Sequence, residues 1–229
     1  MPSRKAAAGA GAQPPSTRKP SRTTSTRDRL LDAAEALFAE HGFHGAPMRD
    51  ITTQAGTRLA DINDHFGSKE VLFQEVVARR ALQINADRQA RLADMAGVKG
   101  RAAQIRAIVE AFAAPLLARS AESQGWRNYL RLLAQLTNSR SLVLVLIAEH
   151  FNPIAEVFIE QIVRVLPQLD RRQSLNAYQL MVASSMALFA DNGRIDIMSG
   201  GQERSDDFAS HYGDMVSFVA GGILAIAES

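Results

Sequence analysis

A glycine-containing turn, Ala55-Gly56-Thr57, precedes a short segment whose polar side chains can form hydrogen bonds with the edges of DNA bases. Arg58 can donate to guanine O6 and N7, and Asn63 can pair with adenine. Each contact of this kind discriminates between bases by about 1–3 kcal/mol. A short helix that follows a tight turn is the arrangement that places such side chains in the major groove, so the segment indicates recognition of double-stranded DNA.

Residues on both sides of this segment extend the predicted DNA-binding surface. Ser68 and Lys69 begin the next helix, where free backbone amides and a cation suit a phosphate group. Asp64 would be repelled by phosphates, so it must either face a base such as cytosine or lie away from the backbone. The complete set of predicted DNA contacts is Arg27, Arg49, Arg58, Ala60, Asp61, Asn63, Asp64, His65, Ser68 and Lys69.

Glycine breaks and apolar positions at three- and four-residue spacing predict four helices around these residues. Ser25 or Thr26 can cap the first helix, Pro47 suits the first position of the second, and Ser68 can cap the fourth. We expect Leu59, Ile62 and Phe66 to anchor the third helix, and Val71, Leu72, Val76 and Val77 to be apolar positions of the fourth. The expected ranges are about 25–41, 47–55, 58–65 and 69–95.

The remaining chain shows helical periodicity throughout and no convincing strand. The sequence therefore predicts an all-α protein with an N-terminal three-helix helix-turn-helix domain and a C-terminal helical domain for ligand binding and dimerisation. Asp170 and Gln173 have the spacing of a capping box. Further helices are expected near 101–119, 124–138, 141–167, 170–192 and 205–227. We divide the chain into a basic tail (1–25), a DNA-binding domain (26–72) and a C-terminal domain (73–229).

Composition excludes several classes of function. The 229 residues include no cysteine, which excludes disulfides and thiolate metal sites or nucleophiles and fits a reducing compartment. We find no secretory signal, no membrane span, no phosphate loop, no His-rich metal motif and no G-x-S-x-G serine motif. The expectation is a cytoplasmic protein that is not an enzyme and uses no cofactor, no metal and no membrane partner.

The first 25 residues carry five basic side chains and no acid, among many Pro, Gly, Ala, Ser and Thr residues. Such a composition cannot bury a core and is typical of a disordered leader. The alternative is a basic arm that contacts phosphate or the minor groove.

Three stretches, RDRLLDAAEALFAEHGF, PMRDITTQAG and HFGSKEVLFQEVV, resemble the N-terminal domain of the TetR family of transcriptional regulators. The resemblance implies an all-helical homodimer whose variable C-terminal domain holds the dimer interface and a ligand pocket. It also implies that an effector changes the separation of the two DNA-reading heads and releases DNA. The sequence departs from the family at positions 63 and 64, where one or both residues are usually aromatic, and at Ala46, where a capping Ser or Thr is usual.

Downstream stretches RRALQINADRQARL, WRNYLRLLAQL, IAEHFNPIAEVF and ALFADNGRID resemble the fatty-acid-responsive PsrA-like subgroup of the same family. This second resemblance implies an apolar or acyl-type effector, a fatty acid or an acyl-CoA. Large apolar walls with a few polar groups characterise such sites, although aromatic residues more often serve ordinary core packing. Arg127 and Arg131, on one helix face, could hold an acyl carboxylate. The predicted effector-binding residues are Trp126, Tyr129, Arg131, Gln135, His150, Phe151, Phe158 and Gln179.

Small and apolar residues in the last two predicted helices indicate a dimer surface. Paired across a two-fold axis, these helices would form a four-helix bundle, and half-sites of the operator would lie about one helical turn apart. The predicted interface residues are Met181, Ser184, Met186, Met215, Phe218 and Gly222. The favoured function is a ligand-responsive repressor. The alternative is a TetR-like DNA-binding protein with a structural or division-linked role and no small-molecule effector.

Overall fold

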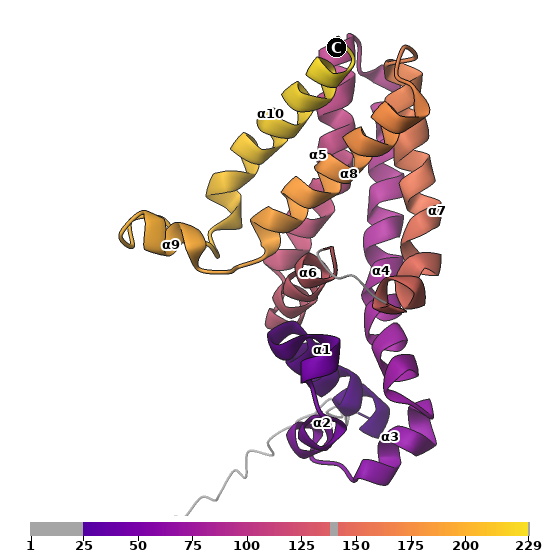
Figure 1. Cartoon of the computed structure of the whole chain (residues 1–229), viewed down its shortest axis with the longest axis vertical. Coiled ribbons are helices and arrows are strands. Elements are labelled where there is room, and N and C mark those ends of the chain that lie inside the picture. Colours follow the sequence, from indigo (N-terminus) through magenta and orange to yellow (C-terminus); the bar gives the residue numbers. More distant parts are fainter. Residues whose placement is uncertain (1–24, 138–141, 229) are drawn as a thin grey trace, which may run out of the picture.

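The computed structural model describes residues 25–137 and 142–228, and within these ranges every regular element is a helix (Figure 1). The all-helical prediction is therefore confirmed. The elements are α1 (Thr26–Gly45), α2 (Met48–Ala55), α3 (Leu59–Phe66), α4 (Lys69–Ala93), the 3-10 turn η1 (Asp94–Gly97), α5 (Arg101–Ser120), α6 (Gln124–Leu136), α7 (Leu142–Val165), α8 (Arg171–Phe189), α9 (Arg194–Met198) and α10 (Phe208–Ile226). Residues 1–24 of the predicted tail lie outside the described residues.

Helices α1, α2 and α3 form a small head with the beginning of α4. Its core contains fully buried Ile51 and Ile62, together with the rings of Phe38 and Phe43, each of which meets the Phe73 ring edge-on. Such T-shaped aromatic pairs add about 0.5–1.5 kcal/mol beyond the area that they bury. The tight packing of this core fixes the direction in which α3 points.

Two predicted anchors of the head are wrong. Leu59 is 45% exposed, because it lies in the first turn of α3, where the helix leaves the core. Val71 is 39% exposed, because it lies off the stripe of α4 that contains Leu72, Val76 and Val77. The other expected apolar positions are buried.

The helix ends follow local capping chemistry. The side chain of Ser25 accepts a hydrogen bond from the Asp28 amide, and that of Ser68 accepts one from the Val71 amide. Asp170 and Gln173 form the expected capping box. Pro47 is the N-cap of α2 rather than its first residue, and it provides no side-chain cap. The preceding Ala46 is completely buried and packs in the core of the head.

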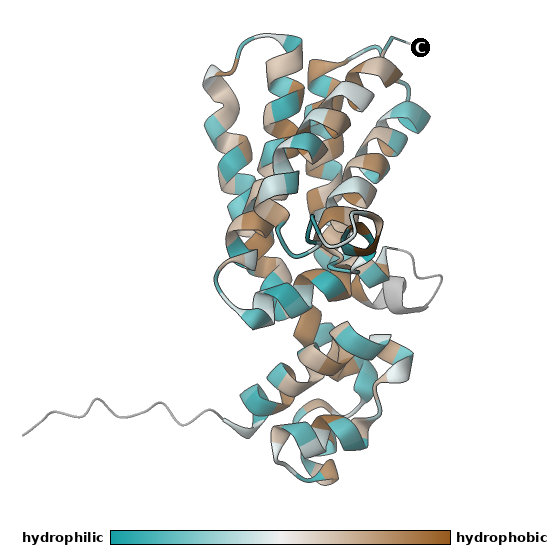
Figure 2. Cartoon of the chain, turned by 90° about the vertical axis from the view of Figure 1, so that its left-hand side faces the viewer, coloured by the Kyte–Doolittle hydropathy of each residue, from teal (hydrophilic) through white to brown (hydrophobic). Residues whose placement is uncertain are grey.

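Helix α4 is continuous from the head into the C-terminal part, where it packs against α5 and α7 (Figure 1). The boundary expected at residue 72 therefore falls within α4. Figure 2 shows hydrophobic and hydrophilic residues alternating along the long helices, as amphipathic helices require. Helix α6 lies against α1 and α8, so it connects the head to the C-terminal bundle. None of the helices in the described part of the chain is both long and apolar enough to cross a membrane.

Candidate DNA-reading surface and ligand cavity

Helix α3 presents one polar face to solvent, at the end of the molecule opposite α8 and α10 (Figure 1). Ile62 and Phe66 hold its other face in the core. The side chains of Ala60, Asn63, Asp64 and His65 are exposed. An exposed helix with small and amide side chains on its outer face is able to enter a major groove and contact base edges.

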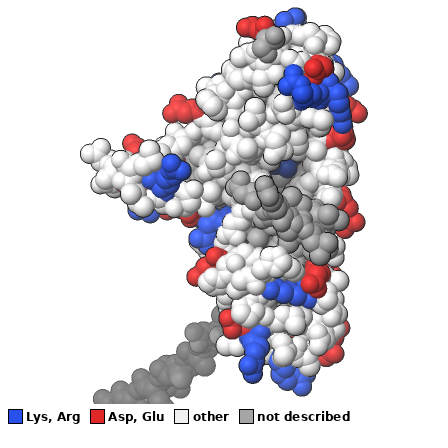
Figure 3. Space-filling view, viewed as in Figure 1, with Lys and Arg blue, Asp and Glu red and all other residues white. Residues whose placement is uncertain are grey.

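Arg49 of α2 adds an exposed cation beside this face. Its guanidinium forms no hydrogen bond or ion pair with any described residue, so it remains available for a phosphate group. Figure 3 shows Lys and Arg side chains gathered at the end of the molecule where α2 and α3 lie.

Arg58 and Asp61 are joined to each other at the start of α3. The Arg58 amide donates to Asp61 Oδ2 at 2.8 Å, and the Arg58 guanidinium donates to Asp61 Oδ1 at 3.1 Å. The hydrogen bond from the Arg58 amide, more than any other contact, lowers the pKa of the Asp61 carboxyl group. The Asp61 carboxylate is thus engaged as a helix cap, whereas the Arg58 side chain is 84% exposed and can leave this weak surface pair to contact DNA.

Three of the predicted DNA contacts also hold the head together. Arg27 forms an ion pair with Glu75 of α4, and its guanidinium lies 5.3 Å from the centre of the Phe66 ring. The ammonium group of Lys69 lies 4.9 Å from the centre of the Phe43 ring, and partial burial lowers its pKa. The Ser68 hydroxyl caps α4. These contacts fix where α4 begins beside α3.

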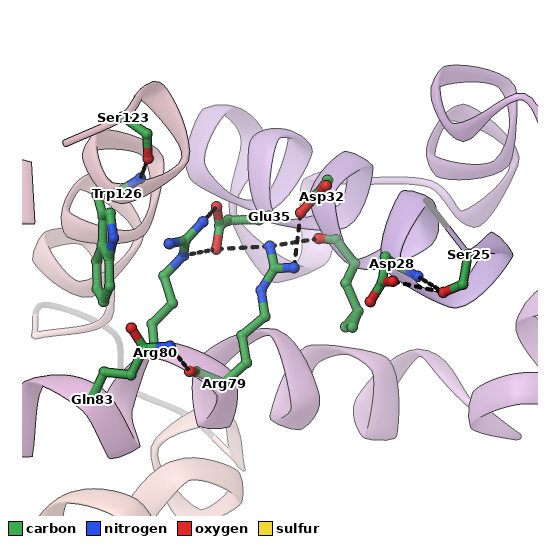
Figure 4. A network of polar contacts seen from close by, with 10 residues as sticks. Ser25, Asp28, Asp32, Glu35, Arg79, Arg80, Gln83, Ser123 and Trp126 are labelled. Atoms are coloured by element: carbon green, nitrogen blue, oxygen red, sulfur yellow. Dashed lines mark hydrogen bonds and ion pairs between the residues drawn. The ribbon is translucent and has the colours of Figure 1, made fainter. Parts of the chain in front are cut away.

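A buried carboxylate joins the head to the rest of the molecule (Figure 4). Glu35 of α1 is 1% exposed, and its Oε1 accepts a hydrogen bond from Arg80 Nη2 at 2.8 Å. Arg79 Nη2 lies 3.0 Å from Glu35 Oε2, and Arg79 Nη1 bonds to Asp32 at 2.8 Å. The sequence analysis missed this network. Its signal was a glutamate on the apolar face of the first helix, four residues after Leu31 and three before Phe38.

The network continues to α6 through Trp126. The Arg80 guanidinium lies 4.5 Å from the centre of the Trp126 ring, and that of Arg119 lies 5.2 Å from it. A Cβ atom at Gly125 would come within 2.4 Å of Arg80 Nη2, so any other residue there would require the Arg80 guanidinium to move. Gln135 of α6 donates to the carbonyl oxygen of Ala39 in α1 at 2.6 Å. These contacts make α6 the link between the head and the C-terminal bundle.

A cavity of about 330 Å³ lies within the C-terminal bundle, at the lower end of the range usual for small-molecule sites. Phe151 and Gln179, both predicted effector contacts, contribute to its lining. The lining residues are Arg88, Phe112, Leu133, Leu136, Thr137, Ile147, Ala148, Phe151, Asn152, Ala155, Tyr178, Gln179, Val182 and Met186.

The other predicted effector contacts do not line this cavity: Trp126, Tyr129, Arg131, Gln135, His150 and Phe158. Trp126 and Gln135 belong to the link with the head. Phe158 packs behind the cavity against Phe112, with ring centres 5.3 Å apart. Arg131 bonds to Asn128, and Arg127 donates to the Ser120 carbonyl, so this arginine pair does not face the cavity.

Arg88 is the cavity residue that the sequence analysis missed. It is 2% exposed and lies on the buried stripe of α4, four residues after Ile84. Its Nε donates to the Phe112 carbonyl at 3.1 Å and its Nη1 to Asn85 Oδ1 at 3.4 Å. No carboxylate within the described ranges pairs with it. Burial lowers the pKa of Arg88 to about 10, which leaves the guanidinium charged at neutral pH. The sequence signal that could have identified Arg88 was an arginine within the apolar stripe of this helix.

The two faces of α8 and α10 differ sharply. Met181 and Met186 are buried inside the protomer, and Met186 lines the cavity, so these two predicted interface residues cannot reach a partner. Phe218 is 76% exposed, and Leu180, which the prediction omitted, is 55% exposed. Gly222 is exposed, and Ser184 and Met215 are half-buried.

Helix α9 stands away from the bundle beside this surface (Figure 1). It exposes Ile197 by 83% and Met198 by 75%. The sequence analysis did not predict α9, because five residues are too few to show helical periodicity. No group of three His, Asp or Glu side chains in the described part of the chain is placed to hold a metal ion.

Comparison with protein families finds two matches. Residues 30–76 match the family described as bacterial regulatory proteins, tetR family. Residues 110–222 match the tetracyclin repressor-like C-terminal domain. The two matched segments lie on either side of the middle of α4 and together cover well over half of the chain.

Individual relatives agree with these matches. The chain is 32% identical over 87 residues to the HTH-type transcriptional repressor AcnR of Corynebacterium glutamicum, a match covering 38% of this chain and 42% of the repressor. The chain thus spans less than half of the length of the curated relatives it matches.

Two solved structures share the fold over most of their length. One is the fatty acid degradation regulator FadR of Bacillus halodurans (TM-score 0.58, 17% identity, 85% of this chain and 98% of that chain). The other is FadR of Bacillus subtilis in complex with stearoyl-CoA (TM-score 0.53, 13% identity, 85% of this chain and 97% of that chain). At these identities the likeness concerns the fold alone.

Proposed function

This chain belongs to the TetR family of bacterial regulatory proteins, and on that premise we propose that it is a ligand-responsive transcriptional repressor. It binds a pseudo-palindromic operator as a homodimer and leaves the operator when a small apolar or acyl-type molecule occupies the C-terminal cavity. The observation that carries the proposal is the combination, in one chain, of an exposed reading helix and a mostly apolar cavity, with α6 lying between them.

The DNA-binding part of the proposal rests on the outer surface of α3. Asn63 and Arg58 supply base contacts, and Arg49 supplies a phosphate contact. Asp64 lies on the same exposed face, where it can accept a hydrogen bond from a cytosine amino group. The absence of aromatic residues at positions 63 and 64 favours an operator whose recognition depends on hydrogen bonds to bases.

The cavity favours a ligand-responsive regulator over a DNA-binding protein with a purely structural role. Its volume and mostly apolar lining are suited to a small amphiphilic molecule. The structure of FadR from Bacillus subtilis contains stearoyl-CoA, which supports an acyl ligand for a protein of this fold. A structural role would require no cavity.

Helix α6 provides the route from the cavity to DNA. Its residues Leu133 and Leu136 line the cavity, whereas Gln135 bonds to the backbone of α1 on the other side. A ligand that displaces α6 therefore acts directly on α1 and, through the core of the head, on α3. In a dimer this movement changes the separation of the two reading helices and lowers the affinity for the operator.

The dimer forms through the outer surfaces of α8 and α10. Phe218 and Leu180 supply apolar area, and the exposed Gly222 permits close helix approach. The exposed Ile197 and Met198 of α9 extend the same surface and contact the partner protomer.

The test begins with genome-wide footprinting of DNA bound by the protein. The recovered operator is labelled, and its binding is followed by fluorescence anisotropy in the presence of fatty acids and acyl-CoAs of different lengths. We expect at least one compound to release the DNA and to raise the melting temperature of the protein. If the protein binds a symmetric site, but no compound releases the DNA or raises the melting temperature of the protein, the structural role would be favoured. A lack of any specific site would contradict the repressor function.

A further inference from the structure

We propose that the cavity binds a free apolar monocarboxylate with its head inward, so that the carboxylate contacts Arg88 at the closed end and the hydrocarbon chain extends toward the opening. This inference rests on the proposed function, because it assigns a ligand class to the proposed effector cavity.

The charge of Arg88 meets no counter-charge among the described residues. The side chain is 2% exposed, and its hydrogen bonds within the described chain go to a backbone carbonyl and an amide oxygen, both neutral. Its Nη2 donates to no described residue. Uncompensated buried charges are costly, and an anion that enters such a site gains both charge attraction and hydrogen bonds. The buried guanidinium is therefore suited to bind an anionic ligand.

The direction of the ligand follows from burial around the cavity. Arg88 and Phe112 are buried at one side, with the guanidinium 3.8 Å from the centre of the Phe112 ring. Asn152 and Gln179 are exposed and mark the side open to solvent. Between them, Leu136, Ile147 and other apolar side chains line the space. An anionic head must therefore pass inward to reach Arg88, with its apolar chain filling the space behind it.

Tyr178 supplies a hydroxyl group in the same region. It lines the cavity and packs edge-on against Phe112, with ring centres 6.2 Å apart. Arg88 lies against the same Phe112 ring and also lines the cavity, so the two groups face the same space. Burial raises the pKa of the Tyr178 hydroxyl, which keeps it neutral. A neutral hydroxyl beside a guanidinium can donate an additional hydrogen bond to a carboxylate.

The same arrangement disfavours a thioester. The acyl end of an acyl-CoA carries a neutral carbonyl, which cannot compensate the charge of Arg88. Its charged phosphates lie on a nucleotide portion too large to enter a cavity of about 330 Å³. The cavity therefore selects the free acid.

The test measures binding directly by isothermal titration calorimetry, without DNA. The probes share one chain length: decanoate, 1-decanol, decyl phosphate and decanoyl-CoA. The full-length protein is compared with Arg88→Met, which keeps the side-chain volume without the charge, and Arg88→Lys. The matched control is Arg91→Met, an exposed arginine one turn further along α4. Thermal melts check that each variant is folded.

We expect decanoate to bind the unmodified protein at least about tenfold more tightly than 1-decanol or decanoyl-CoA. Arg88→Met should lose this preference while still binding 1-decanol, Arg88→Lys should retain part of it, and Arg91→Met should behave as the unmodified protein. Equal binding of acid and alcohol, or decanoate binding that survives Arg88→Met, would overturn the inference but leave the cavity as an effector site. Tighter binding of decyl phosphate than decanoate would overturn the carboxylate assignment. Failure of all four probes to bind would contradict both the inference and an acyl-type effector.

Discussion

Glu35 and Arg88 are charged residues that the described part of the chain buries almost completely, and they differ in their partners. The Glu35 carboxylate is paired with Arg79 and Arg80, whereas the partners of Arg88 among the described residues are neutral. A paired buried charge is costly to break, because the removal of one member leaves the others uncompensated. At the residue scale, Glu35 therefore has a structural role and Arg88 is suited to binding.

The substitution Glu35→Gln should lower the free energy of unfolding by about 3 kcal/mol, because it leaves two partly buried arginines without their shared carboxylate. Urea titrations followed by circular dichroism measure this loss. Glu40→Gln, on an exposed side chain of the same helix, is the control and should change stability by less than about 0.5 kcal/mol. Equal effects of the two substitutions would show that the network does not stabilise the head.

On the reading surface, Asn63→Ala and Arg49→Ala should have different effects. Loss of a base contact at Asn63 should weaken binding to the operator by about 1–3 kcal/mol. It should also relax the sequence specificity at one base pair. Loss of a phosphate contact at Arg49 should weaken binding to all DNA sequences similarly. It should also reduce the slope of log affinity against log salt concentration by about 1. Anisotropy titrations at several salt concentrations, on operator and scrambled DNA, distinguish the two. A reversed pattern would mean that α3 does not enter the groove by its Asn63 face.

At the scale of elements, α1 contains a backbone feature that joins two helical pieces. Gly42 adopts φ 69° and ψ 175° inside α1, a conformation open essentially to glycine alone. The kink allows the chain to turn toward Phe43, whose ring packs on Phe73, and toward the buried Ala46. The glycine was expected to end the helix, but hydrogen bonding resumes beyond the kink as far as Gly45.

Gly42→Ala should therefore lower stability by about 1–3 kcal/mol, through backbone strain rather than collision, since its Cβ would meet only Gln135 Oε1 at 3.6 Å. Gly97→Ala is the matched control: it needs no positive φ, and a Cβ there would meet nothing within 4 Å. Thermal and urea unfolding give the measurement. If Gly42→Ala were as stable as the control, the kink would not be required by the fold.

At the scale of the whole molecule, exposed apolar side chains occur on α8, α9 and α10, outside the reading head (Figure 1). Phe218, Leu180, Ile197 and Met198 are all more than half exposed on these helices. Exposed apolar area of this kind usually marks an association surface. Because half-sites of a symmetric operator lie a fixed distance apart, dimerisation through this surface also determines the spacing of the two heads.

Phe218→Asp should convert the proposed dimer to a monomer, because it places a charge at the centre of the apolar surface. Size-exclusion chromatography with light scattering measures the mass, and anisotropy should show a large loss of operator affinity. Leu82→Asp, on an exposed side chain of α4 outside this surface, should leave both the mass and the operator affinity unchanged. A dimer that persists in Phe218→Asp would place the interface elsewhere.

The features that could be predicted from the sequence are those that local interactions along the chain determine. The Ser25 and Ser68 caps, the Asp170–Gln173 capping box and the order of the long helices depend on neighbours within a few residues, and the structure confirms them. The family followed from motifs in the first third of the chain. The exposed face of α3 also followed, because Ile62 and Phe66 determine which side is buried.

Only the tertiary structure decided which side chains meet across helices. Aromatic residues at helical spacing suggested a ligand site, but Trp126 lies on the link to the head, because α6 turns one face toward α1 and another toward the cavity. Met186 carried the signature of an interface yet faces inward. Arg88 belongs to no recognisable sequence motif. Its suitability as a ligand contact is visible only in the folded structure, where it lines the cavity and bonds to a neutral carbonyl group. Hydrophobic periodicity in the sequence indicates which face of a helix is buried. Which other helix covers that face depends on packing between segments that are distant in sequence.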